Sequence, residues 1–151
     1  MIMNLRTMFS LLTFLLVVAG PARAELNVYL ENLNLSARAD LGDFEAHLGA
    51  RFGTSQAQLE VVLSNVDSPA DAALVLWLGE RSRQPVNRVL QVYRQEKSQG
   101  WGVIARNLGI KPGSADFHAL KNGNLDFHPS GHSGGKPAKG KKNKNHKGKK
   151  S

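Results

Sequence analysis

The chain has 151 residues, a formal net charge of +8 at neutral pH and no cysteine. This length is typical of one domain. The missing cysteines exclude disulfides, Cys/His zinc spacings, haem attachment through cysteine and a lipid anchor on a cysteine, so a core must hold by packing alone.

The positive charge is concentrated at the C-terminal end. Residues 129–151 contain eight lysines and no acidic side chain, whereas residues 25–128 contain ten basic and twelve acidic side chains. The segment with the apolar residues needed for a core is therefore close to neutral. A composition of this kind favours a folded domain followed by a cationic tail.

The first 24 residues have the pattern of a secretory signal peptide. Arg6 supplies a positive charge, Met8–Ala19 is mostly apolar, and Ala22-Arg23-Ala24 fits a cleavage site. The apolar run is shorter than the roughly 20 residues that span a bilayer. We therefore expect a periplasmic or secreted protein that begins at Glu25 and has no further transmembrane segment; the alternative is an uncleaved N-terminal anchor.

The secondary structure of the first residues after this segment is ambiguous. Glu25–Leu35 alternates at Leu26, Val28 and Leu30, which fits a short strand, an extended segment or the approach to a helix. Because no partner strand is evident, we expect an extended segment or a helix lead-in. A helix capped by Asn34 or Ser36 should follow and end at Gly53, with one apolar face formed by Leu41, Phe44, Leu48 and Phe52.

Two further helices have clear start signals. Ser55 with Gln58 forms a capping box for a helix that should end near Asp67, with a buried face of Leu59, Val62, Leu63 and Val66. Ser68 caps the next helix, and Pro69 occupies its first position. The body of that helix is apolar nearly all round, which predicts a central position and places Trp77 in the core.

Three more helices complete the prediction. Pro85 opens one whose apolar face is Val86, Val89, Leu90 and Tyr93. The next uses Trp101, Ile104, Ala105 and Leu108 and stops at Gly109. After a Lys-Pro-Gly turn, Ser114 caps a short last helix with Phe117 and Leu120. The sequence thus predicts an all-α domain over residues 25–127, a small bundle of about five to six short helices.

Residues 128–151 differ sharply in composition from the preceding domain. They contain glycines and lysines but no large apolar residue. Such a segment cannot bury enough surface to offset its chain entropy, so we expect a disordered tail.

Few patterns of catalytic chemistry are present. The chain lacks a glycine-rich phosphate loop and a Gly-x-Ser-x-Gly elbow, and no activated nucleophile accompanies His118, so we expect a protein that is not an enzyme and needs no cofactor. Histidines do gather near the C-terminus, at His118, His128, His132 and His146. Structural zinc sites need about four fixed ligands, so weak adventitious metal binding is the simpler interpretation.

Residues 104–110 resemble the first half of a DNA-binding helix-turn-helix, with Ala105 four residues before Gly109. The Lys-Pro-Gly-Ser turn is longer than in that motif, and Phe117 and Leu120 fall out of its register. The resemblance therefore implies a packing arrangement without sequence-specific DNA binding.

Four blocks together resemble an uncharacterised family of small exported bacterial proteins. They are ARADLGDFEAHLGARFG, SPADAALVLWLG, PVNRVLQVYR and, most distinctively, GWGVIARNLGIKPGSADFHAL. The resemblance spans most of residues 36–122. It implies a periplasmic helical protein and brings no established activity or site residues.

The function that these patterns favour is a non-enzymatic interaction module. Its basic tail would bind anionic envelope material or other polyanions through Lys136, Lys139, Lys141, Lys142, Lys144, Lys147, Lys149 and Lys150. Two alternatives stay open: the tail only solubilises the protein, or the C-terminal histidines bind metal in the periplasm.

One prediction concerns processing of the N-terminal segment. Expression with export should yield a protein whose first residue is Glu25, because small residues occupy the −3 and −1 positions of the site. Intact-mass analysis of the exported protein measures this directly. A mass that includes Met1 would contradict cleavage and favour the N-terminal anchor.

Overall fold

Helices make up all the regular structure of the described part of the chain. The computed structural model describes residues 21–128, and these form seven α-helices and one short 3-10 turn, which confirms the all-α prediction. The elements are α1 (Pro21–Ala39), α2 (Leu41–Phe52), α3 (Gln56–Leu63), α4 (Pro69–Ser82), α5 (Val86–Glu96), η1 (Lys97–Gln99), α6 (Trp101–Asn107) and α7 (Ala115–Lys121).

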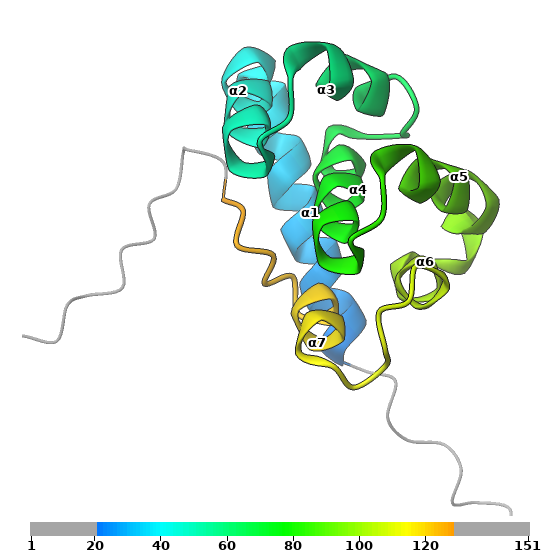
Figure 1. Ribbon diagram of the computed structural model, residues 1–151. Helices are drawn as coiled ribbons and strands as arrows, with labels where there is room; N and C mark the ends of the chain where they lie inside the picture. The colour runs from blue at the N-terminus through cyan, green and yellow to red at the C-terminus, as the bar shows by residue number, and fades with distance from the viewer. Residues whose placement is uncertain (1–20, 129–151) are drawn as a thin grey trace, which may run out of the picture.

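Helix α4 lies at the centre of this arrangement (Figure 1). It contacts α1, α2, α3 and α5, and every residue from Ala72 to Gly79 is buried. Trp77 is only 1% exposed, so its predicted place in the core is confirmed. A helix that is apolar all round needs neighbours on every side, which explains why four others surround this one.

The ends of the helices follow the predicted local signals. The side chains of Ser55, Ser68 and Ser114 each accept a hydrogen bond from the backbone N–H three residues on. Gly53 and Gly109 have positive φ angles of 60° and 92°, the left-handed conformation that ends a helix at little steric cost for glycine. Local capping chemistry therefore fixes most boundaries.

Residues 25–35 are the main correction to the sequence prediction. They are helical, as part of α1, and not extended. Leu26, Leu30, Leu33 and Ala37 follow one another at spacings of four, three and four, so one face of a helix carries them all. The alternation that suggested an extended segment is incidental, since Val28 is 58% exposed. This additional helix raises the number of α-helices in residues 21–128 to seven.

The expected single helix up to Phe52 is also divided. Asp40 has extended backbone angles and caps α2 by accepting a hydrogen bond of 2.9 Å from the Asp43 N–H. Phe44 and Leu48 are buried as predicted, but Leu41 is exposed because it lies in the first turn after the break.

Helix α3 ends earlier than predicted, at Leu63 and not near Asp67. The Asn65 amide and the Ser64 hydroxyl both donate to the Val61 carbonyl, at 2.8 and 3.0 Å. Such side-chain bonds compete with the helical backbone pattern.

Within residues 21–128, no helix is both long enough and apolar enough to cross a bilayer.

The helical state of α1 can be tested with two leucines of the same helix. Leu33 is 1% exposed and Leu35 is 52% exposed, whereas in an extended segment both would lie on one face. Leu33→Ala should lower the free energy of unfolding by about 2–5 kcal/mol. Leu35→Ala should change it by less than about 0.5 kcal/mol. Urea denaturation of both variants measures this difference, and similar losses would contradict the helix.

Candidate functional site

The last described residues form a strap that returns along α1 towards α2. We define the strap as residues 122–128; Figure 1 shows it running from α7 past α1 to the end of α2. Its Leu125 and Phe127 are buried. The Phe127 ring meets the Phe44 ring edge-on at 5.8 Å between centroids, and the Tyr29 hydroxyl donates to the Phe127 carbonyl at 2.7 Å. The strap is thus part of the core.

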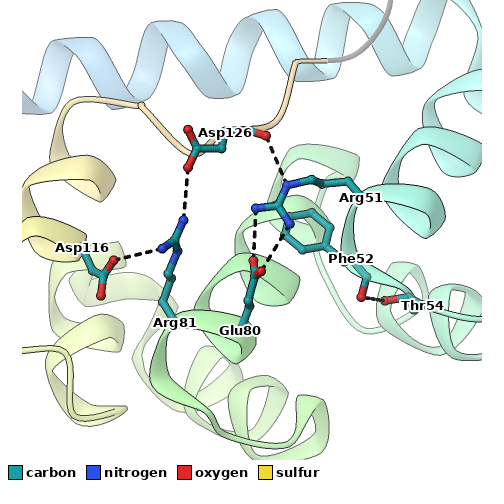
Figure 2. A network of polar contacts seen from close by, with 7 residues as sticks. All are labelled: Arg51, Phe52, Thr54, Glu80, Arg81, Asp116 and Asp126. Carbon is teal, nitrogen blue, oxygen red and sulfur yellow. Dashed lines mark hydrogen bonds and ion pairs between the residues drawn. The ribbon is translucent and has the colours of Figure 1, made fainter.

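Two arginines hold the strap from the side of α2 and α4 (Figure 2). Arg81 pairs with the carboxylates of Asp126, at 3.1 Å, and of Asp116 on α7, at 3.5 Å. Arg51 pairs with Glu80 at 3.2 Å and donates to the Asp126 carbonyl. These side chains are partly exposed, so each pair contributes little on its own. Together they fix where the strap lies, and we assign this network a structural role.

The eight lysines predicted to bind polyanions lie outside the described residues. What the structure defines is the point from which their segment continues, directly after the strap. Because Phe127 is buried and hydrogen-bonded, that point is fixed against α1 and α2.

A polar cleft of about 330 Å³ lies where the start of α4 meets the end of α5. The Tyr93 hydroxyl donates to the Asp71 carboxylate at 3.0 Å and accepts from the Asp67 N–H at 3.2 Å. Lys97 donates to both carboxylate oxygens of Asp67 at 2.7 Å. Trp101 stacks on Tyr93 with 5.3 Å between ring centroids. Each of these polar side chains has a hydrogen-bond partner within the set. We call this contact between the start of α4 and the end of α5 the joint.

The two carboxylates of the cleft titrate differently. Burial raises the pKa of Asp71 above the usual value for aspartate, although the Tyr93 hydrogen bond acts in the opposite direction. The hydrogen bond from Lys97 lowers the pKa of Asp67. Burial also raises the pKa of the Tyr93 phenol well above its ordinary value, so it stays a hydrogen-bond donor. Perturbed groups in a cleft are candidates for function, but here each shift follows from the joint itself.

A larger groove adjoins this cleft and shares Lys97, Ser98 and Trp101 with it. It measures about 560 Å³ and lies between the start of α1, the η1 turn, α6 and α7. This volume is in the range of small-molecule sites. Its apolar lining comes from three helices and the turn between α6 and α7: Leu26, Trp101, Val103, Pro112, Phe117 and Leu120.

The charged side chains of the groove have one sign. Lys97, Arg106 and Lys121 line it, and no acidic side chain does. Lys97 is already paired with Asp67. Arg106 and Lys121 are exposed and, among residues 21–128, are partners in none of the ion pairs or side-chain hydrogen bonds. The groove therefore offers two cations beside an apolar surface.

The histidines do not form a metal site within the described residues. His118 and His128 are both exposed, and among residues 21–128 no three acidic or histidine side chains gather in a way that could hold a metal ion. His132 and His146 lie outside the described residues. The metal-binding alternative stays a prediction for that part of the chain.

The segment that resembles a helix-turn-helix does form a pair of packed helices, α6 and α7. Ala105 is fully buried, as close helix packing requires, and Gly109 turns the chain. Trp101, at the start of α6, is half-buried between the cleft and the groove. The residues predicted to form only a packing unit therefore also contribute the wall of a groove.

Comparisons with protein-family models, with curated proteins and with solved structures found no match for this chain. The resemblance to small exported bacterial proteins stays a prediction.

Sequence reasoning did not identify the groove. Its lining residues fall within three segments, around Leu26, between Lys97 and Arg106, and between Pro112 and Lys121, which are separated in the chain and approach only through tertiary packing. One local signal was available. Gly102 lies inside the apolar pattern of α6, as its second residue, and no turn requires glycine there.

The polar cleft generates a prediction about pH. Because the pKa of Asp71 is raised in the folded state, wild type should gain stability relative to Asp71→Asn as the pH falls from 7 to about 3. Because the pKa of Asp67 is lowered, wild type should lose stability relative to Asp67→Asn as the pH falls through the same range. Urea midpoints at several pH values measure both trends. Trends of the same sign would contradict this account of the joint.

Proposed function

We propose that this protein is a non-enzymatic interaction module whose basic tail attaches it to anionic envelope material or to other polyanions. The observation that carries the proposal is the division of charge. All twelve acidic side chains of the chain lie in residues 25–128, while residues 129–151 contain eight lysines and no acid. A lysine block attracts phosphates or acidic polysaccharide without a fixed partner shape.

The strap supports this proposal from the structural side. It anchors the chain at Phe127, immediately before the tail begins, through a buried ring and a hydrogen bond from Tyr29. A polyanion bound by a tail attached in this way would also hold the helical domain in place. It also leaves the core independent of the lysines, because the described core is complete without them.

The place of action proposed here is the periplasm or the cell exterior, which follows from the signal-like first 24 residues. Removal of residues 1–24 would take away only the first turn of α1, since the helix begins at Pro21 and its buried residues begin at Leu33. Leu26, Tyr29 and Leu30, which pack against the core, would remain. Processing and folding are therefore compatible.

The proposal predicts salt-sensitive binding that depends on the lysines. The logarithm of the affinity for heparin or DNA should fall linearly with the logarithm of the salt concentration, with a slope of roughly −0.7 to −0.9 per phosphate contact for nucleic acid. Few aromatic residues are available in the tail to stack on bases, so DNA sequence should matter little. Fluorescence anisotropy with labelled DNA over a salt series measures the slope.

A matched control keeps the length of the tail. Replacing all eight tail lysines with Gln should abolish binding, whereas Arg88→Gln combined with Lys111→Gln, two exposed cations of the helical domain, should leave most of it. Melting temperatures of all three proteins should be similar. Undiminished binding by the tail variant would place the polyanion site on the helices.

A further inference from the structure

The groove between α1, α6 and α7 has features that the tail does not explain. Its lining combines aliphatic and aromatic side chains, among them Leu26, Val103 and Phe117. Trp101 already has a stacking partner in Tyr93. A flexible apolar chain can follow a mixed lining of this kind, because it adapts its shape to aliphatic and aromatic side chains alike.

The charged side chains of the groove favour an anionic ligand. The helical domain as a whole has more acidic than basic side chains, yet the groove is lined by three cations and no acid. Arg106 reaches it from α6 and Lys121 from α7, and neither is used in the ion pairs of the described residues. An anionic group between them would be complementary to both.

Gly102 supplies an independent observation. Its backbone is helical and it is not among the glycines with positive φ. A Cβ atom at this position would meet only Phe117 Cζ, at 3.8 Å, which is ordinary contact. Neither backbone conformation nor packing around the Cβ position requires glycine here. What a larger side chain would occupy is the groove that Gly102 lines.

From these observations we propose that the groove binds a single-chain anionic amphiphile, namely a fatty acid, with its acyl chain on the apolar lining and its carboxylate between Arg106 and Lys121. The volume of the groove is in the range of small-molecule sites. This site lies within the helical domain, and it is independent of the polyanion binding proposed for the tail.

Isothermal titration calorimetry of the full chain with dodecanoate, below its micellar concentration, tests the proposal. Wild type should bind with saturation near one equivalent. Gly102→Leu should weaken binding strongly because its side chain takes up part of the groove, and it should not lower the melting temperature because leucine favours helix. Gly102→Ala gives the same gain in helix propensity with one added carbon and should still bind. All lysines of the tail remain in both variants, so the tail cannot account for a difference.

The charge requirement is tested separately. Arg106→Gln combined with Lys121→Gln should weaken dodecanoate binding by about two- to thirtyfold, as expected for two exposed ion pairs. The matched control is Arg88→Gln with Lys111→Gln, which removes the same charge from side chains that do not line the groove. Dodecanol should bind more weakly than dodecanoate. Absence of saturable binding, full binding by Gly102→Leu, or equal binding of dodecanol would each overturn the proposal.

Discussion

The fold depends on the burial of the middle of α4. Eight consecutive residues of this helix, Ala72 to Gly79, are buried, so every side of the helix is covered by another element. Small residues allow the neighbours to come close. At Gly79 a Cβ atom would lie 3.4 Å from the Gln84 carbonyl oxygen and 3.7 Å from a Val89 methyl group, so this residue packs directly against the return of the chain into α5. Without disulfides, this packing is the main source of stability.

Both ends of the described chain take part in the core that surrounds α4. Helix α1 covers one side, and the strap then closes over α1 and α2 with Leu125 and Phe127. Gly123 makes that approach possible: its φ is 63°, and a Cβ atom there would lie 2.7 Å from the Tyr29 Cβ. The arginine pairs of Figure 2 hold the same strap from the other side. A domain closed in this way has its first and last described segments in contact, so folding should require the strap as well as α1.

Local chemistry could be predicted from the sequence, and long-range arrangement could not. Caps at Ser55, Ser68 and Ser114 depend on neighbours within a few residues, and all three were found as predicted. Glu25–Leu35 was predicted wrongly because its apolar residues fit both the two-residue period of a strand and the 3.6-residue period of a helix. Contact with α4 favours the helix. The strap has just two apolar residues and no periodicity, so nothing local predicts its burial. The groove is a property of three helices and is not encoded in any one of them.

The two proposed sites use cations in different physical settings. In the proposed polyanion site, the tail lysines would act through long-range attraction alone, which salt screens and which any dense polyanion can satisfy. Arg106 and Lys121 stand beside apolar side chains, so an amphiphile would gain both charge pairing and burial of its chain. Salt weakens the first contribution and leaves the second largely intact. A protein with both settings could therefore stay attached to an anionic surface through its tail while its domain selects, by apolar fit, a smaller molecule from that surface.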